Sequence, residues 1–285
     1  MRQLNNLEKN TQKTIKKIAI IGGQGQMGQL FYRYLSKYPE LLIKLIDREN
    51  FDEINNCLSY DFILISVPID LTKNLIREKL PKFDEKTILC DITSVKSIPL
   101  QAMLDTHQGP VIGLHPMFGP TIESTENQVI VHCPGRHLKA YQWFLDYLVL
   151  CGFKLETISA QTHDQLMNFV QGIEHFSSFC LGSFLKKQNI NLQQLLNLAS
   201  PVYQMELNIV GRLFYQSPEL YADIIMTDKN RLEMIESYVD HVKENLNLLK
   251  NNDRAAFIEK FKSINQWMGK FSEKAYNQTD KTLKK

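Results

Sequence analysis

A glycine-rich turn between a β-strand and a helix is the feature that most restricts how this chain can fold. The apolar run IAII (residues 18–21) predicts the strand, and GGQGQMG (residues 22–28) follows it directly. In a GxGxxG turn, here Gly23, Gly25 and Gly28, the first glycine permits a tight bend. The second lets the backbone approach a pyrophosphate, and the third lets the helix lie close to the strand. This order of elements predicts a dinucleotide-binding domain; a turn that only connects a strand to a helix is the alternative.

The residues after the turn fit the same domain. Apolar side chains at Met27, Leu30, Phe31, Tyr34 and Leu35 follow the spacing of a helix with one face packed on a sheet. The next strand, residues 41–46, runs into Asp47, at the distance where an acidic residue binds the ribose 2′-hydroxyl. Asp47 would repel a 2′-phosphate, which favours NAD over NADP as the cofactor, although Arg48 beside it could offset that repulsion.

The predicted secondary structure changes near residue 158. Before that point, short β-rich runs alternate with helical patterns, which predicts βαβ units and a mostly parallel sheet. After it, long helical periodicities take over. The fold class is therefore α/β, with a Rossmann-type domain over residues 16–158 and an all-α domain over residues 159–285. The predicted strands are 18–21, 41–46, 62–67, 87–91, 111–115, 128–133 and 153–158.

Composition excludes several classes of partner. The 285 residues carry 33 Lys and Arg against 31 Asp and Glu, a net charge of +2, which predicts neither nucleic acid nor an anionic membrane as a partner. No apolar run is long enough to cross a bilayer. The five cysteines are widely spaced, which suits reduced thiols and predicts no metal site. With a polar N-terminus that lacks a signal-peptide core, we expect a globular cytoplasmic protein with a small-molecule partner.

Three strands end in polar or conformationally restricted residues, and ligands of open α/β sheets bind at such strand ends. The third strand runs into Ser66-Val67-Pro68, the fourth into DITSVK (residues 91–96), and the fifth into GLHPMFGP (residues 113–120). His115 is the candidate general base, because imidazole titrates near neutrality and hydride loss from a carbinol carbon needs a proton acceptor. A histidine satisfied by backbone groups is the alternative. Ser94 could bind the same hydroxyl, orient the imidazole, or simply cap a helix.

The predicted contacts of the dinucleotide combine the turn, the acidic strand end and the later strand ends. They are Gly23, Gly25, Gln26, Met27, Gly28, Asp47, Arg48, Ser66, Val67, Pro68 and Thr93.

Taken together, GGxGxMG, SVP, DxxSVK and especially GLHPMFGP resemble prephenate dehydrogenase, nearest to the dehydrogenase portion of enzymes fused to chorismate mutase. The resemblance covers residues 17–271 and includes GRLF (residues 211–214) and YADIIM (residues 221–226). It implies oxidative decarboxylation of prephenate to 4-hydroxyphenylpyruvate with NAD, in tyrosine biosynthesis. It places the catalytic histidine on His115 and the hydrogen-bonding serine on Ser94.

The resemblance also implies substrate-binding residues in the helical part. Arg212 would bind a substrate carboxylate, and a guanidinium suits this role because it offers a bidentate fork and stays charged. A structural ion pair is the alternative for Arg212. His163, His175 and Tyr221 would line the cleft and contact the substrate or the feedback inhibitor tyrosine; ordinary interfacial roles are equally open for them.

Two departures from the family pattern leave the substrate open. Glu174 and Gln204 stand where close relatives tend to carry arginine, which keeps arogenate, with its amino-acid side chain, as an alternative substrate. Seventeen residues before the first strand are too few for a chorismate mutase, so we expect a monofunctional enzyme or the dehydrogenase part of a longer protein.

Other classes of protein remain as rivals. β-Hydroxyacid dehydrogenases carry a lysine base on the first long helix of the second domain, but the predicted helix 162–185 contains no lysine. A non-catalytic module that binds NAD or tyrosine is the alternative outside enzymes. Apolar residues in the helical part exceed what one small domain needs, and they predict a homodimer: Leu195, Leu196, Leu198, Ile209, Val210, Leu213 and Phe214.

Overall fold

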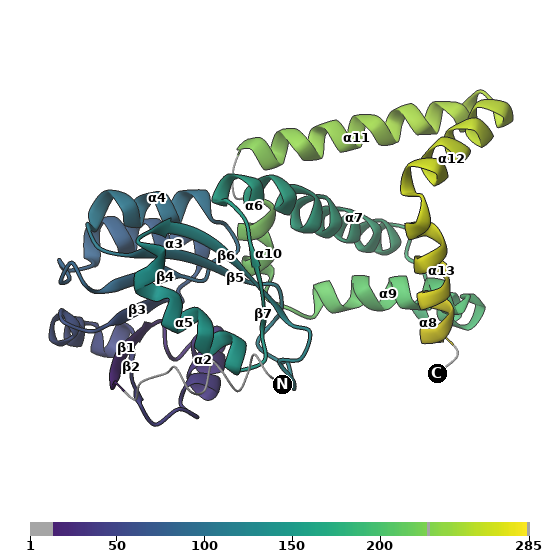
Figure 1. The fold of residues 1–285 in the computed structure, drawn as a ribbon. Coiled ribbons are helices and arrows are strands. Elements are labelled where there is room, and N and C mark those ends of the chain that lie inside the picture. Colours follow the sequence, from purple (N-terminus) through teal and green to yellow (C-terminus); the bar gives the residue numbers. More distant parts are fainter. Residues whose placement is uncertain (1–13, 227–228, 284–285) are drawn as a thin grey trace. The chain divides into compact units, whose positions relative to one another are not determined.

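The computed structural model describes residues 14–226 and 229–283, and the chain divides into two compact units, Met1–Met167 and Asn168–Lys285 (Figure 1). Helix α6 (Ala160–Met167) belongs to the first unit, where it packs against α4 (Ser97–Thr106) and the sheet. The predicted domain limits, 16–158 and 159–285, would place α6 in the second part instead. Those limits stay a prediction.

The first unit is built on a seven-stranded sheet with the order β2-β1-β3-β4-β5-β6-β7. Strands β1 to β5 are parallel, β6 is antiparallel to β5, and β7 is parallel to β6. This confirms the predicted Rossmann-type, mostly parallel sheet. The strands are β1 (Lys16–Ile21), β2 (Leu41–Ile46), β3 (Phe62–Ile65), β4 (Ile88–Asp91), β5 (Val111–Pro116), β6 (Val129–Arg136) and β7 (Lys154–Thr157).

Strand β1 lies between β2 and β3, so the chain leaves it first to one side and later to the other. Such a reversal of direction is a topological switch point, where the connections diverge and leave a crevice at the carboxyl ends of the strands. The glycine-rich turn follows β1, and the residues from Ser66 onward follow β3. The topology therefore positions the predicted dinucleotide contacts around one crevice.

Alternating side chains of the strands build a core on each face of the sheet. Ile18 and Ile20 point to the face covered by α2 (Gln26–Leu35) and α5 (Leu138–Leu150). Ala19 and Ile21 point to the opposite face, which α4 and shorter helical segments cover (Figure 1). Burial on both faces explains why these strands are apolar at nearly every position.

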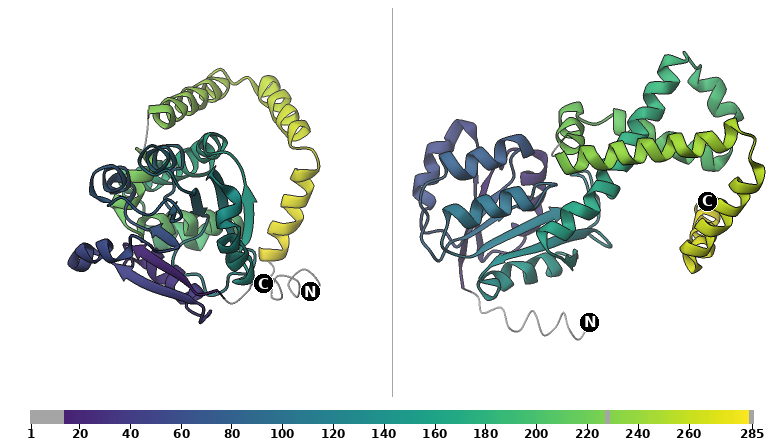
Figure 2. Two further views of the ribbon diagram at one scale, coloured as in Figure 1. Left: turned by 60° about the vertical axis from the view of Figure 1, so that its left-hand side comes forward. Right: turned by 90° about the horizontal axis from the view of Figure 1, so that it is seen from above.

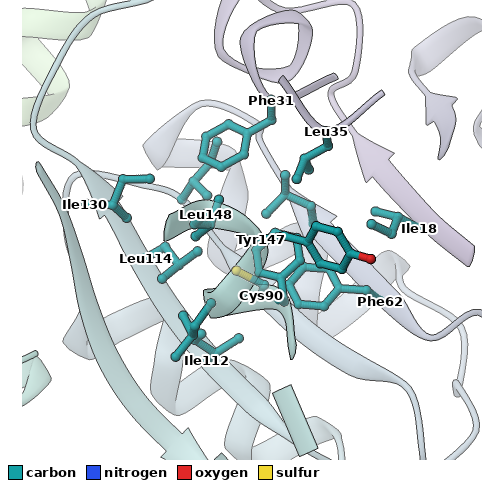
Figure 3. Close-up of a cluster of buried hydrophobic side chains, with 14 of the residues drawn as sticks. Ile18, Phe31, Leu35, Phe62, Cys90, Ile112, Leu114, Ile130, Tyr147 and Leu148 are labelled. Carbon is teal, nitrogen blue, oxygen red and sulfur yellow. The ribbon is translucent and has the colours of Figure 1, made fainter. Parts of the chain in front are cut away.

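The core beneath α2 and α5 combines aliphatic and aromatic side chains (Figure 3). The rings of Phe62 and Phe144 stack with centroids 3.9 Å apart. Tyr147 is buried beside them, and its hydroxyl donates a hydrogen bond to Glu40 at 2.8 Å. This bond satisfies the one polar group that Tyr147 brings into an otherwise apolar cluster.

The second unit is helical, as the sequence predicts. The predicted helix 162–185 is present as a continuous helical run, in which the π-helical turn η3 (Asn168–Ile173) joins α6 to α7 (Glu174–Lys187). Figure 2 shows the last three helices as an arc, with α12 and α13 in yellow. The remaining helices are α8 (Leu192–Leu198), α9 (Pro201–Phe214), α10 (Pro218–Ile225), α11 (Lys229–Lys250), α12 (Arg254–Met268) and α13 (Lys270–Leu283).

Serine-proline pairs start two of these helices. The Ser200 side chain accepts a hydrogen bond from the Tyr203 amide at the start of α9, and Ser217 accepts one from the Leu220 amide at the start of α10. The proline after each serine occupies the first turn, where no amide donor is required. These local signals fix where α9 and α10 begin.

Arg231 connects three elements of the second unit. Its side chain, 1% exposed, donates hydrogen bonds to the Ile224 carbonyl in α10 and to the Asn168 side chain in η3. Its aliphatic part lies against Gly172, where an added Cβ would come within 3.1 Å of the Arg231 Cγ.

Within the described residues, no helix is long and apolar enough to span a bilayer.

We expect Leu148→Ala to lower the free energy of unfolding by about 2–5 kcal/mol, because it opens a cavity in a close-packed core. Leu148 is 0% exposed on α5, whereas Leu138 on the same helix is 45% exposed. The matched Leu138→Ala variant should therefore change the free energy by less than about 1 kcal/mol. Urea denaturation measures both, and equal losses would contradict this account of the core.

Candidate active site

Two glycines of the turn are required by close backbone contacts. Gly22 adopts a φ of +76°, and a Cβ there would lie 2.3 Å from the Ser66 carbonyl oxygen. A Cβ on Gly28 would lie 2.5 Å from the Gly22 carbonyl oxygen. The turn, the first turn of α2 and the end of β3 are therefore locked together. The sequence motif gave no role to Gly22, although two consecutive glycines could have signalled a left-handed backbone.

The start of α2 has the features of an anion-binding site. Gly25 occupies the N-cap position and provides no capping side chain, and Gln26 and Met27 are the first helical residues. A Cβ on Gly25 would meet only the Gly22 carbonyl oxygen within 3.5 Å, so the approach to this helix end is open. Backbone amides and the helix dipole at such an end favour a phosphate. The geometry therefore fits the pyrophosphate of a dinucleotide.

Asp47 is held rigidly beside the turn. One carboxylate oxygen accepts a hydrogen bond from the Gln24 amide at 3.0 Å, and the other accepts one from the Arg48 amide at 2.8 Å. In addition, the Asn50 side chain accepts a bond from the Asp47 amide at 2.7 Å. The carboxylate is thus fixed next to the glycine turn, in the position required to bind ribose hydroxyls.

A pocket of about 820 Å³ lies around these residues in the first unit. Its lining includes six of the predicted dinucleotide contacts: Gly25, Asp47, Arg48, Ser66, Val67 and Pro68. Sequence analysis missed other residues that line it, namely Phe51, Leu71, Asn74, Leu75, Glu78 and Lys79. They lie on the helical segments that follow β2 and β3, and the position of those segments directly after the switch-point strands was the available signal.

The loop after β4 differs in detail from the prediction. Thr93 is buried, and its hydroxyl lies 2.6 Å from the Asp91 carboxylate, so the side chain is directed into the loop rather than offered to a cofactor. Helix α4 begins at Ser97 with Lys96 as its N-cap. Ser94 therefore does not cap this helix, and that alternative is wrong. Ser94 is half-buried in the loop, between the carboxyl end of β4 and α4.

A buried ion pair holds this loop against β5. The Lys96 ammonium lies 2.5 Å from the Asp91 carboxylate and donates a second hydrogen bond to the Leu114 carbonyl at 2.6 Å. Both charged side chains are 0% exposed. Leu114 precedes His115, so the pair fixes the β4–α4 loop beside the candidate base. Sequence analysis gave Lys96 no role; a lysine five residues after a strand-end aspartate was the available signal.

His115 lies near the end of β5 and is part of a buried hydrogen-bond chain. Its Nδ1 is 2.8 Å from the Nε2 of His163, and the Nδ1 of His163 is 2.8 Å from the Asp164 carboxylate. His115 is 3% exposed and His163 is 0% exposed. Both ring nitrogens of His163 are therefore engaged within the protein, and its predicted contact with substrate stays a prediction.

Three of the four predicted substrate-binding residues, Arg212, His175 and Tyr221, lie in the second unit, whereas His163 lies in the first. The His175 and Tyr221 rings meet edge to face with centroids 4.9 Å apart, and His175 is paired with Glu174. Burial raises the pKa of Tyr221, Glu174 raises it further, and the Arg212 charge lowers it. Arg212 and Glu174 therefore both act on Tyr221, and the cluster contains a cation and an anion.

Sequence analysis missed one member of this cluster. The Gln216 side-chain amide donates hydrogen bonds to the Tyr221 hydroxyl at 2.9 Å and to the Arg212 carbonyl at 3.1 Å. Gln216 follows the end of α9, in a segment that the sequence marks only as a break between helices. Because a single glutamine bonds to both predicted binding residues, it fixes the spacing between α9 and α10.

Comparison with known proteins identifies the family. Residues 39–155 match the family model of the prephenate dehydrogenase nucleotide-binding domain, and residues 159–263 match that of the prephenate dehydrogenase dimerization domain. The chain is 46% identical over 256 residues to the T-protein of Enterobacter agglomerans, and this alignment covers 90% of the chain and 68% of that protein. The chain belongs to the prephenate dehydrogenase family. The predicted family and an NAD-dependent dehydrogenase are therefore confirmed.

Two further family members and one solved structure extend the comparison. The T-protein of Haemophilus influenzae is 43% identical over 278 residues, covering 96% of this chain and 73% of that protein. A probable arogenate/prephenate dehydrogenase of Methanocaldococcus jannaschii is 34% identical over 294 residues, covering 96% and 65%. The Synechocystis arogenate dehydrogenase structure matches with a TM-score of 0.68 at 17% identity, covering 90% of this chain and 100% of that one. That structure supports the fold.

We expect Asp47→Asn to weaken NAD binding by roughly tenfold, equivalent to about 1.4 kcal/mol. NADP binding should weaken less or improve, because the carboxylate that repels a 2′-phosphate is gone. Asp52→Asn, an exposed change in the helical segment after β2, should leave both affinities unchanged. Titration calorimetry with each nucleotide measures the effect, and an equal loss for NAD and NADP would contradict the role given to Asp47.

Proposed function

We propose that this chain oxidatively decarboxylates prephenate to 4-hydroxyphenylpyruvate with NAD, the dehydrogenase step of tyrosine biosynthesis. The observation that carries the proposal is the position of His115. It lies at the carboxyl end of a parallel strand, in the same unit as the dinucleotide pocket, and its imidazole is held by a second histidine. Ligands of open α/β sheets bind at this edge, so a base here faces the place where a cofactor and a substrate meet.

The proposed reaction assigns a task to each candidate residue. NAD, held by the pocket that includes Gly25 and Asp47, would supply the acceptor for the hydride of the substrate carbinol carbon. His115 takes the hydroxyl proton, and the ring carboxylate leaves as carbon dioxide. The electron pair of the broken C–C bond makes the ring aromatic, and the proton returns from His115 to the phenolate oxygen of the product. Ser94 binds the same hydroxyl or orients the imidazole, and Arg212 binds a carboxylate as a bidentate cation. His175 and Tyr221 contact the substrate, and the same cluster is where tyrosine would act as a feedback ligand.

Arogenate is the second candidate substrate, and the Glu174 carboxylate favours it. Glu174 pairs with His175 in the cluster that also contains Arg212 and Tyr221. A carboxylate beside a guanidinium suits a group that carries both an ammonium and a carboxylate, as the arogenate side chain does, better than the keto acid of prephenate. The name of the Methanocaldococcus jannaschii relative includes both activities.

The decisive assay follows NADH or NADPH formation with prephenate and with arogenate, each tested with NAD and with NADP. We expect turnover with NAD. His115→Asn should lower kcat by about 10² to 10⁴, the usual contribution of a general base, while NAD still binds. His241→Asn, an exposed change on α11, is the matched control and should retain activity. If the wild-type enzyme binds NAD but shows no turnover with any of the four combinations of substrate and cofactor, a non-catalytic nucleotide-binding module would be favoured.

We also propose that the chain forms a homodimer through its helical unit. Among its described helices, α7, α8, α12 and α13 contain no buried residue. Large apolar side chains are exposed on them and on α9, including Phe184, Leu198, Phe214 and Trp267. A groove of about 710 Å³ between α7, α8 and α9 is lined by Phe179, Leu196 and Phe214. Such faces are covered by a partner in most folded proteins.

Light scattering at micromolar concentration should give twice the 33.1 kDa of one chain. The physical reason is that α7, α8, α12 and α13 contain no buried residue within a single copy, while large apolar side chains are exposed on them. A stable monomer mass across this concentration range would contradict the homodimer. The cytoplasmic location stays a prediction of the sequence.

A further inference from the structure

A partly buried chain of hydrogen bonds connects the start of α4 to the candidate base on β5. The Asp164 carboxylate accepts hydrogen bonds from the backbone amides of Lys96 at 2.9 Å and Ser97 at 2.8 Å. The same carboxylate lies 2.8 Å from the Nδ1 of His163, whose Nε2 lies 2.8 Å from the Nδ1 of His115. All five residues belong to the first unit.

The direction of each hydrogen bond follows from the charge of Asp164. Burial by itself would raise the pKa of Asp164, but the hydrogen bonds from His163, Ser97 and Lys96 lower it to about 2. Asp164 is therefore an ionised carboxylate near neutral pH and can only accept hydrogen bonds. The Nδ1 of His163 must then donate to it.

The tautomer of the second ring follows from that of the first. A neutral imidazole carries one proton, so a His163 ring that donates through Nδ1 accepts through Nε2. The bond between the two rings then requires the Nδ1 of His115 to be the donor. In neutral His115 the remaining nitrogen, Nε2, carries the lone pair. The chain of bonds thus selects which nitrogen of His115 is basic.

The nearby buried ion pair leaves the charge of Asp164 available to the histidines. Lys96, Asp91 and Asp164 all act electrostatically on the Cys133 thiol. The ion pair between Lys96 and Asp91 therefore lies close to Asp164. The Lys96 ammonium binds the Asp91 carboxylate at 2.5 Å, whereas only its backbone amide reaches Asp164. The two side-chain charges compensate each other, so Asp164 is the anion that acts on the imidazole pair.

We propose that His163 and Asp164 are positioning residues that hold His115 in the tautomer with a basic Nε2 and stabilise the imidazolium formed when it takes a proton. This inference rests on the proposed role of His115. In the step concerned, the substrate O–H bond breaks and an N–H bond forms at Nε2. The proton on Nδ1 stays in its bond to His163, and no proton moves to Asp164. An aspartate behind a catalytic histidine has the same effect in serine proteases.

The first test compares Asp164→Asn with Asp105→Asn. Asparagine can donate from its amide to the Nδ1 of His163, which reverses the tautomers, and it removes the negative charge. Since Asp164 acts through one additional ring, we expect kcat to fall by about 10- to 100-fold, less than the ~10⁴ of the protease case. In Asp164→Asn, the KM for substrate and the affinity for NAD should change less than about threefold, because Asp164 is not expected to touch a ligand.

The pH profile distinguishes positioning from mere support of the fold. Loss of the carboxylate destabilises the imidazolium, so the pKa of the base falls and the acid limb of the kcat profile should move to lower pH. Asp105→Asn, at the other end of α4 in an exposed pair with Arg77, should move neither kcat nor the profile. An Asp164→Asn enzyme with the kcat and profile of the wild type would overturn the inference.

A second pair of variants covers the case in which Asp164→Asn does not fold. Glutamine at position 163 can still accept a hydrogen bond from His115, whereas leucine, of similar size, cannot. We expect His163→Gln to retain at least about tenfold more kcat than His163→Leu, because a hydrogen bond to a group that becomes charged is stronger than one between neutral groups. Equal kcat values for the two variants would overturn the inference.

Imidazole ¹⁵N spectra test the tautomer without any turnover. With the His115 signals assigned by their loss in His115→Asn, we expect a protonated Nδ1 in the wild-type enzyme near neutral pH. A protonated Nε2 would overturn the inference. Active wild-type enzyme with unaffected variants would refute the positioning role and leave the proposed function intact. Inactive wild-type enzyme would count against the function, and the tautomer would then decide the inference.

Discussion

Lys96 lies where four elements of the first unit meet, and its buried contacts hold the candidate active site together. Its ammonium binds Asp91 at the end of β4 and the Leu114 carbonyl in β5, while its amide is bound by Asp164 of α6 at the start of α4. Removing one partner of a buried ion pair typically costs about 3–5 kcal/mol, because the other charge is left without compensation. The orientation of the His115 strand and of the Ser94 loop therefore depends on this residue.

Dinucleotide binding and proton transfer are supported by different parts of the same sheet. The pocket lies at the switch point between β1 and β3, where glycine contacts and the fixed Asp47 carboxylate shape a site for a pyrophosphate and a ribose. The candidate base lies two strands further along, on β5. Parallel strands present all their carboxyl ends at one edge, so the sheet aligns both functions without a direct contact between their residues.

The helical unit has a different physical character. Its core is thin, and buried Arg231 supplies much of the connection between η3, α10 and α11. Its polar cluster, with Arg212, Glu174, His175 and Tyr221, depends on the spacing of α7, α9 and α10. Helices with so little buried surface gain most of their stability from packing against other surfaces. Association of two copies would therefore stabilise the cluster as well as the unit.

Local patterns in the sequence determined the strands of the first unit and the position of the dinucleotide site. Seven apolar runs predicted the seven strands, and the glycine spacing with Asp47 predicted the dinucleotide site, because strand periodicity and turn chemistry act over a few residues. GLHPMFGP singled out His115 in the same way. Only the tertiary structure paired His163 with His115, directed the Thr93 hydroxyl into its loop and excluded Ser94 as a helix cap. These outcomes depend on hydrogen bonds between residues such as His115 and His163, which are 48 positions apart, and no local pattern specifies which distant partner a buried polar group will find.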